Sequence, residues 1–397
     1  MKTIFAHDHR FYRSPDNREI LSKNAFGVSM WKRYLEFTDE LRVVARVFDF
    51  PRDATREKMA LSSSDDVTFQ HMDGTHSWKS ILPKNNTQKQ MEQQVADVDA
   101  VIARLPSRIG SMAVKAARKQ DKPYMVEVVG DPVESYHYHG SKILKLMASY
   151  AGKKMKNDIA GASHVLYVTK EDLQLKYPTK GEQAAASNVE IEMIDLAVYE
   201  KRKQKIKKRA TQEMMKIGMI GTLATNYKGI DTAIDAVREL KKQNRAVHLY
   251  IIGPGDTTKW SELAKKAGVI EEVTFCGILP GGQEILDWLD TMDIYIQPSK
   301  TEGVPRALIE AMSRGCPAVG SEAGGIPELL SNHMLHAIGD SKELANRIAY
   351  LDSKEIQWEE SWRNIQKASD YTKPVLQKRR SALYRSFFQT IKYRGMK

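Results

Sequence analysis

Short apolar runs alternate with amphipathic helical stretches along almost the whole chain, and this alternation constrains the fold more than any other feature. Strands are predicted over Thr3–Ala6 and within the segments LRVVARVFDF, DAVIARLP, KPYMVEVVGDP and ASHVLYVT. Helical patterns over residues 112–117 and 143–162 separate the later strands. Strands that alternate with helices favour βαβ units and a parallel sheet, so we predict an α/β protein.

The segment KRKQKIKKR, residues 201–209, interrupts the alternation with seven basic residues in nine, and a new series of strands and helices begins at MKIGMIG. We therefore predict two α/β halves, over residues 1–200 and 214–372, joined by a basic linker over residues 201–213. A C-terminal helix is predicted over residues 373–397, and one place for it is against the first half. Ligands of parallel sheets lie beyond the carboxyl ends of the strands, so the predicted site is a cleft between the halves.

The composition excludes a disordered chain and a membrane-spanning one. Apolar residues make up 42% of the sequence, and no apolar run approaches the roughly 18 residues of a spanning helix. The apolar run within the N-terminal MKTIFAHDHR is too short for a signal peptide. Cys276 and Cys316 have the spacing of neither a disulfide framework nor a metal site, and we interpret the pair Asp97 and Asp99 as structural. These features favour a cytoplasmic protein without a metal.

The net charge of +11 indicates an anionic partner: nucleic acid, an anionic membrane surface or a phosphorylated substrate. The sequence shows no nucleic-acid recognition motif and no interleaved aromatic residues, so nucleic acid is not the expected partner. Two interpretations of residues 201–209 stay open. The run is either a solvated linker or helix face, or a contact with an anionic membrane or ligand.

The segment DIYIQPSKTEGVPRALIEAMSRGCPAVGSEAGGIPELL, residues 293–330, carries the strongest motif. A buried strand is followed by a loop with Glu302 and Gly303, and a helix begins near Pro305. The free N–H groups at that helix N-terminus favour a bound negative charge. The Glu302 carboxylate is placed to accept hydrogen bonds from sugar hydroxyls, and Glu310 from both hydroxyls of a ribose.

Two glutamates separated by seven residues, within EGVPRALIEAMSRGCPAV and before AGGIPELL, resemble the signature of retaining nucleotide-sugar glycosyltransferases of the GT-B fold. More narrowly, the segment resembles family 4 of these enzymes. The resemblance implies two Rossmann-like parallel-sheet domains that face a central cleft. It covers residues 214–340 well and the first half mostly by the order of strands and helices. A solvated helix start with a capping role is the alternative for both glutamates.

The resemblance also implies how the second half binds its donor. In MKIGMIGTLATNYKGIDTAIDAV, Lys228 matches a family lysine that holds the donor diphosphate. The family arginine that shares this task usually follows the glycine at Gly221, and Thr222 stands there instead. Arg306 or a basic residue of the first half could replace it. The remaining donor-binding candidates are loop residues after strands and at the helix start, namely Gly253, Ile278, Leu279, Gly303, Val304 and Pro305.

The first half resembles the family less closely. A family histidine often follows the central strand of this half, and here Asp131 stands about where that histidine is expected. His137 and His139 follow shortly after, and a structural role for any of the three is as well supported as a catalytic one. Arg104 and Ser107, at another strand end, are candidates for binding the acceptor. The predicted catalytic residues are therefore Glu302, Lys228, Asp131 and His137.

The resemblance implies a retaining, metal-independent hexosyltransferase. Such an enzyme transfers a sugar from a nucleotide-diphosphate donor, a UDP- or GDP-sugar, to a glycan or lipid-diphosphate-linked acceptor in polysaccharide or glycoconjugate biosynthesis. No further cofactor is required, and the enzyme is expected in the cytoplasm, with the inner membrane face as a peripheral partner. The alternatives are another nucleotide-sugar enzyme, such as an epimerase, and a donor-binding protein of low activity.

Overall fold

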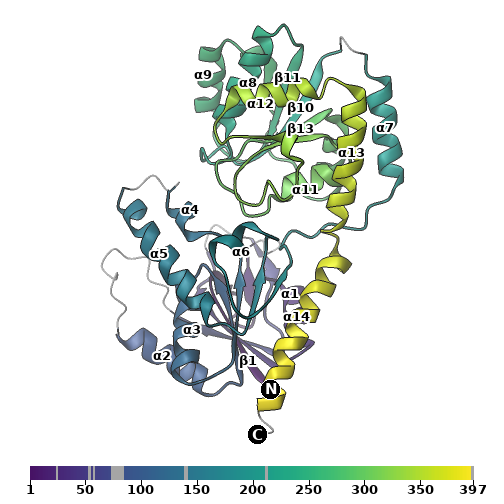
Figure 1. The fold of residues 1–397 in the computed structure, drawn as a ribbon. Helices are drawn as coiled ribbons and strands as arrows, with labels where there is room; N and C mark the ends of the chain where they lie inside the picture. Colours follow the sequence, from purple (N-terminus) through teal and green to yellow (C-terminus); the bar gives the residue numbers. More distant parts are fainter. Residues whose placement is uncertain are drawn as a thin grey trace. The chain divides into compact units, whose positions relative to one another are not determined.

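The computed structural model describes residues 1–23, 26–51, 55–56, 59–72, 85–137, 142–210 and 213–394 (Figure 1). The chain forms two compact units. Unit 1 contains Met1–Ala186 and Lys378–Lys397, and unit 2 contains Ser187–Gln377. Both units are α/β structures built on largely parallel sheets, so the predicted fold class is confirmed.

Unit 1 is built on a nine-stranded sheet of order β4-β2-β1-β6-β7-β8-β9, with β3 pairing with β1 and β5. Its strands are β1 (Lys2–Arg13), β2 (Ile20–Ser22), β3 (Glu40–Phe48), β4 (Ala60–Leu61), β5 (Val67–His71), β6 (Ala100–Leu105), β7 (Tyr124–Val128), β8 (His164–Tyr167) and β9 (Glu182–Ala185). All six residues of the central strand β6 are buried, as in parallel sheets that helices cover on both faces. The helices before unit 2 are α1 (Val28–Leu35), α2 (Asn85–Ala96), α3 (Arg108–Lys119), α4 (Pro132–His137), α5 (Lys142–Ala160) and α6 (Asp172–Lys176).

Strand β1 is longer than the predicted Thr3–Ala6. It pairs with β3 from Lys2 to Tyr12, with a register shift between Ala6 and Arg10. The prediction used the apolar run alone, and the strand continues through polar residues because β3 supplies backbone partners beyond it.

Helix α14 (Lys373–Arg394) begins in unit 2 and belongs to unit 1 from Lys378 onward (Figure 1). The Tyr384 hydroxyl donates a hydrogen bond to the Glu127 carboxylate at 2.6 Å, and the Phe388 ring stacks on Phe37 at 5.8 Å between centroids. The buried Glu127 also accepts a hydrogen bond from the Tyr34 hydroxyl at 2.8 Å. The last part of the described chain therefore completes the core of unit 1.

Unit 2 is built on a six-stranded parallel sheet of order β12-β11-β10-β13-β14-β15. Its strands are β10 (Met215–Ile220), β11 (Val247–Ile252), β12 (Val273–Phe275), β13 (Ile294–Gln297), β14 (Ala318–Ser321) and β15 (Leu335–His336). Its helices are α7 (Ala197–Lys208), α8 (Ile230–Lys242), α9 (Thr258–Ala267), α10 (Gln283–Thr291), α11 (Arg306–Ser313), α12 (Ser341–Tyr350) and α13 (Lys354–Ser369), with short 3-10 turns at Ile270–Glu272 and Asn332–Met334. Because the strands are parallel, their carboxyl ends meet at one edge of the sheet.

The segment predicted as a basic linker, residues 201–213, begins inside helix α7, which belongs to unit 2. Arg202 is buried, and its guanidinium donates hydrogen bonds to the main-chain oxygens of Leu289, Met292 and Arg314 at 3.0, 2.6 and 3.1 Å. Ile206 is buried on the same face of the helix. Most of the basic run is therefore a surface helix of unit 2 rather than a linker. The boundary between the two units lies between residues 186 and 187.

Candidate active site

The carboxyl ends of β10, β11, β13 and β14 place four loops at one edge of the unit 2 sheet, where ligands of α/β proteins bind. Two glycines allow these loops to touch. Gly229, with φ of +74°, lies against Pro298, and a Cβ atom there would come within 1.9 Å of the Pro298 carbonyl oxygen. Gly324, with φ of +52°, lies equally close to the carbonyl oxygen of Glu302. The loops after β10 and β14 are thus both packed against the loop after β13.

Lys228 and Glu302, predicted from separate motifs 74 residues apart, form an ion pair in this site. The distance between Lys228 Nζ and Glu302 Oε1 is 2.5 Å, and the two side chains are 19% and 10% exposed. Lys228 also lies 5.2 Å from the ring centroid of Tyr227, as in a cation–π contact. The site therefore holds a cation paired with an anion, and both side chains are still partly exposed to solvent.

The Glu302 carboxylate has two further partners that the sequence analysis missed. Its Oε1 atom accepts hydrogen bonds from Gln297 Nε2 at 3.1 Å and from Ser299 Oγ at 2.8 Å. Tyr295 OH donates to Gln297 Oε1 at 2.8 Å, and Gln297 and Ser299 are buried. A glutamine at the end of the apolar strand IYIQPS was the available signal, because a buried polar group needs a hydrogen-bond partner.

Helix α11 begins at Arg306, one residue after Pro305, and among the described residues no side chain caps its first turn. Its leading N–H groups are therefore open to an anion. Glu310 lies one turn into the helix, where burial raises the pKa of its carboxyl group and Arg306, 3.8 Å away, opposes that shift. Arg306 also lies 3.5 Å from the main-chain oxygen of Glu190, and its side chain is 56% exposed.

Thr222 supports the loop after β10. Its hydroxyl donates to the Pro254 carbonyl oxygen at 3.2 Å and accepts from the Ala224 N–H at 3.3 Å. Gly221 is buried beside the Lys228 side chain, and the nearby Lys300 ammonium is paired with Asp231 at 2.6 Å. Thr222 thus brings no charge to the site.

The predicted base-binding loops lie at the same sheet edge. The Gly253 N–H donates to the Gly277 carbonyl oxygen at 2.8 Å, which joins the loop after β11 to the loop after β12. Beyond Gly277, Ile278 is 69% exposed and Leu279 is half-buried. An exposed isoleucine next to open main chain is an apolar surface on which a flat ligand can rest.

The unit 1 candidates have structural partners. Asp131 accepts hydrogen bonds from the Val133 N–H at 2.8 Å and the Tyr177 hydroxyl at 2.5 Å, and lies 3.4 Å from Lys176 Nζ. Burial and the Asp131 charge raise the pKa of Tyr177, so the phenol stays protonated as a donor. His137 is the last residue of α4, its side chain lies outside the described part, and His139 lies outside the described residues.

Ser107 and Arg104 also serve the structure of unit 1. The Ser107 hydroxyl caps α3 by accepting from the Gly110 N–H at 2.9 Å. Arg104 is buried 3.4 Å from the Glu127 carboxylate and 5.2 Å from the Phe26 ring. Burial and the charge of Arg104 lower the pKa of His7 to about 3, so that histidine is neutral.

No group of described residues has the arrangement of a metal site. The pair interpreted as structural has ordinary protein partners: Asp97 forms an ion pair with Arg42 at 2.8 Å, and Asp99 accepts from the Lys2 N–H at 2.7 Å. Among the described helices, none combines the length and apolar character needed to cross a bilayer.

Three comparisons place this site among known proteins. Residues 215–353, which hold the four loops, match the family model described as glycosyl transferases group 1. Protein CapJ of Staphylococcus aureus is 32% identical over 378 residues, 94% of this chain and 92% of that protein. The amylovoran biosynthesis glycosyltransferase AmsK of Erwinia amylovora is 39% identical over 141 residues, 33% of this chain and 34% of that protein.

The whole fold resembles a solved structure as well. The structure of Anabaena Alr3699/HepE in complex with UDP has a TM-score of 0.62 and 15% identity, and the match covers 99% of this chain and 100% of that chain. At this identity the likeness shows the fold, which is the predicted two-domain GT-B fold.

Proposed function

This chain belongs to the glycosyl transferases group 1 family, and we propose that it is a retaining, metal-independent hexosyltransferase of polysaccharide or glycoconjugate biosynthesis. The observation that carries the proposal is the Lys228–Glu302 pair beside the uncapped N-terminus of α11. A cation, a helix N-terminus and a carboxylate at one sheet edge suit a ligand with a diphosphate and a sugar. The name of AmsK, a biosynthetic glycosyltransferase, supports the same class of reaction.

The proposed donor is a UDP- or GDP-sugar, and UDP is the first to test because Alr3699/HepE was solved with UDP. Lys228, the N–H groups of Gly303 and Val304, and the N–H groups at the start of α11 after Pro305 would hold the diphosphate. Glu310 would accept hydrogen bonds from the ribose hydroxyls. The loops of Gly221 and Thr222, of Gly253, and of Ile278 and Leu279 would frame the nucleoside.

In the proposed reaction the bond between the anomeric carbon and the donor phosphate breaks, and the acceptor oxygen bonds to the same face of that carbon. The leaving diphosphate gains negative charge, which Lys228 and the α11 N-terminus stabilise electrostatically. A phosphate oxygen takes the acceptor proton, so no protein nucleophile is needed. Glu302 orients the donor sugar through its hydroxyls.

The proposed acceptor is a glycan or a lipid-diphosphate-linked glycan, bound by unit 1. Asp131 and His137 remain our proposed residues of unit 1 for the reacting face. The Asp131 contacts also provide a purely structural explanation, so its contribution is decided by measuring turnover and stability of the same variant.

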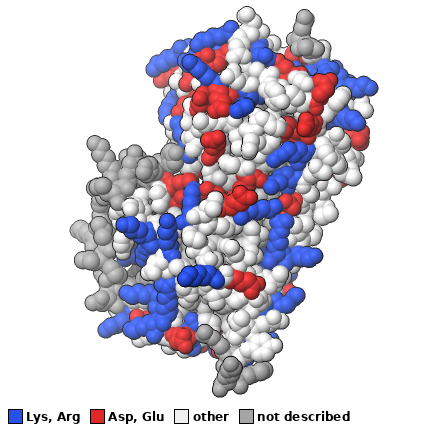
Figure 2. Space-filling model, in the orientation of Figure 1, with Lys and Arg blue, Asp and Glu red and all other residues white. Residues whose placement is uncertain are grey.

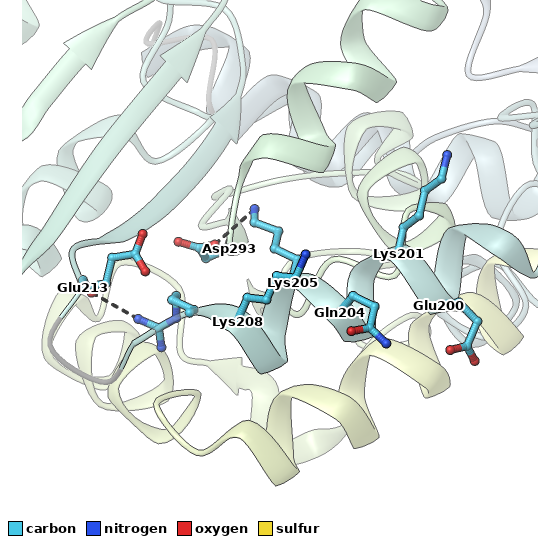
Figure 3. Close-up of a pocket in the computed structure, with 8 residues that line it drawn as sticks. Glu200, Lys201, Gln204, Lys205, Lys208, Glu213 and Asp293 are labelled. Carbon is cyan, nitrogen blue, oxygen red and sulfur yellow. Dashed lines mark hydrogen bonds and ion pairs between the residues drawn. The ribbon is translucent and has the colours of Figure 1, made fainter.

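An anionic membrane is the further partner that we propose. On the face drawn in Figure 2, Lys and Arg are spread over both units with Asp and Glu between them, so net charge alone locates no partner. Helix α7 is a more specific candidate for the contact than the net charge. Its residues line a hollow of about 740 Å³ together with Asp293 and Glu213 (Figure 3). Within it, Lys205 points to Asp293, with the charged atoms 3.1 Å apart, whereas Lys201 extends away.

The outer side of α7 combines exposed cations with exposed apolar groups. Lys201, Lys203, Lys207 and Lys208 are exposed, and none has an ion pair with another described residue. Met193 and Leu196, just before the helix, are 71% and 61% exposed. Lysines beside apolar side chains suit an anionic bilayer, where each lysine contributes about 1 kcal/mol.

Vesicle flotation tests this membrane contact. We expect the protein to float with phosphatidylglycerol vesicles at low salt and to lose about 100-fold in partitioning when Lys201, Lys203 and Lys207 are changed to Gln. The matched control changes Lys259, Lys265 and Lys266 of α9 to Gln. Equal flotation of both triple variants would reject α7 as the contact.

A thermal-shift panel of UDP, GDP, ADP, CMP and their common sugars tests the function itself. A ligand at a hundred times its dissociation constant adds about 2.7 kcal/mol of stability. We expect one nucleoside diphosphate to stabilise the protein and Lys228→Ala to weaken that effect, while Lys266→Ala on exposed α9 does not. No stabilisation by any of them would contradict the proposal.

The uncharged Thr222 favours one alternative, a donor-binding protein of low activity. This alternative predicts nucleotide binding without measurable sugar transfer. Thr222→Arg then separates the two, since an added guanidinium beside the diphosphate should raise turnover only where a missing charge limits it.

A further inference from the structure

We propose that Gln297 and Ser299 are positioning residues that keep the Glu302 carboxylate oriented when Lys228 leaves it for the donor diphosphate. The proposal rests on the proposed function, because it concerns the same donor site. It assigns a role to two polar side chains that are buried from solvent.

Three donors converge on a single atom. Glu302 Oε1 accepts from Lys228 Nζ at 2.5 Å, Ser299 Oγ at 2.8 Å and Gln297 Nε2 at 3.1 Å. Among the described residues none donates to Oε2 of Glu302, which leaves that oxygen for a ligand hydroxyl. The protein thus binds the Oε1 atom of Glu302 and leaves its Oε2 atom accessible to a ligand hydroxyl.

The direction of each neutral hydrogen bond is set by the next one. Tyr295 OH donates to Gln297 Oε1, so the amide nitrogen of Gln297 must face the other way, toward Ser299 and Glu302. Gln297 Nε2 also donates to Ser299 Oγ at 2.8 Å, which leaves the Ser299 hydroxyl proton for Glu302. Such a chain of aligned hydrogen bonds strengthens each member.

Glu302 needs the hydrogen bonds of Gln297 and Ser299 because Lys228 is also a ligand for the donor diphosphate in the proposed function. A diphosphate carries more negative charge than one carboxylate and competes for the Lys228 ammonium. Glu302 is only 10% exposed, and a largely buried carboxylate without partners is costly. Gln297 and Ser299 remain bonded to Oε1 after the ammonium turns away, so Glu302 stays in place for the sugar.

The test separates sugar handling from nucleotide binding. We measure kcat, KM and the dissociation constant of the stabilising nucleoside diphosphate for wild type, Gln297→Leu, Ser299→Ala and Ser299→Thr. The first two should lose up to about 100-fold in kcat with nucleoside diphosphate binding within threefold of wild type, because misplaced groups cost this much in rate. Ser299→Thr keeps the hydroxyl and should retain most of the turnover.

The matched control is Gln357→Leu, which removes another buried glutamine of unit 2 that donates to the Leu351 carbonyl oxygen. It should lower Tm and leave kcat unchanged. Wild-type kcat in both Gln297→Leu and Ser299→Ala, or an equal loss of nucleotide affinity and kcat, would overturn the proposal. If the wild type binds no nucleoside diphosphate at all, the proposed function fails first and this inference with it.

Discussion

The two units are built on the same kind of sheet, but the N-terminus of helix α3 in unit 1 differs from that of helix α11 in unit 2. In unit 1, the start of α3 is capped by Ser107, and the Asp8 carboxylate accepts from the N–H groups of Arg108 and Ile109 at 2.7 and 3.1 Å. In unit 2, the start of α11 has no side-chain cap. A helix start that the protein has already filled with a carboxylate has no room for a ligand phosphate.

The acidic residues differ in the same way. Asp131 of unit 1 is held by Tyr177, Lys176 and the backbone of Val133. In the part of the chain that the structure describes, Glu302 of unit 2 is held through its Oε1 atom only. We therefore expect the carboxylate that binds a ligand to be the one with an oxygen that no described residue occupies, whatever its place after a strand.

The largest effect is expected for the cation of unit 2. Lys228→Ala should lower kcat by about 100- to 1,000-fold, because it removes the charge that stabilises the leaving diphosphate. Initial-rate measurements with the donor identified by the panel check this, with Lys266→Ala as the control. A kcat within threefold of wild type would mean that unit 2 does not supply the decisive charge.

A smaller effect is expected at Glu310. Glu310→Ala should weaken nucleoside diphosphate binding by about 10- to 100-fold, the range for losing hydrogen bonds to a charged group. Isothermal titration calorimetry measures the affinity, and loss of ribose recognition predicts that inorganic diphosphate binds both proteins equally. Unchanged nucleotide affinity would remove Glu310 from the site.

Acid should affect unit 1 through its histidines. The pKa of His7 is lowered to about 3 by burial, Arg104, His9 and Arg46, against a backbone hydrogen bond that raises it. The unfolded chain binds the proton first, so stability is full above pH 6.5 and falls as pH decreases, by about 2 kcal/mol for His7 at pH 5. Urea unfolding at pH 7 and pH 5 should show a smaller difference for His7→Phe than for wild type, and an identical difference would contradict this origin.

The smallest effect decides the role of Asp131. If Asp131 serves only as the cap of helix α4, Asp131→Ala should cost about 1 kcal/mol of stability and leave turnover within a few-fold of wild type. Tm and kcat of the same variant check this, with Asp131→Asn as the milder change. A large loss of kcat at unchanged Tm would instead establish the predicted catalytic role and make unit 1 resemble unit 2.

Sequence patterns predicted the fold because alternating strands and helices follow from local hydrophobicity. They also selected Lys228 and Glu302 as candidates, since each stands in a local motif after a strand. The contact between these two could not be predicted, because it joins loops 74 residues apart. Gln297 and Ser299 were missed because the glutamine at the end of an apolar strand indicates a buried polar group but does not identify Glu302 as its partner.

The error at residues 201–213 has a related cause. The sequence shows Arg202 as one of seven cations, and nothing local distinguishes it from the exposed Lys201 and Lys203. Its partners are carbonyl oxygens 87 to 112 residues further along the chain. A run of charged residues therefore predicts an exposed segment, and only the tertiary structure shows which of its side chains is buried.

The return of α14 to unit 1 means that the core of this unit is completed late in synthesis. The first 186 residues leave the ribosome early, yet Glu127 lacks the Tyr384 hydroxyl until the whole of unit 2 has been translated. Domains usually fold as they emerge, and a late segment leaves the earlier one with exposed apolar surface meanwhile. The core of unit 1 therefore cannot be completed before unit 2 has been translated, and until then Phe37 lacks the Phe388 ring that stacks on it.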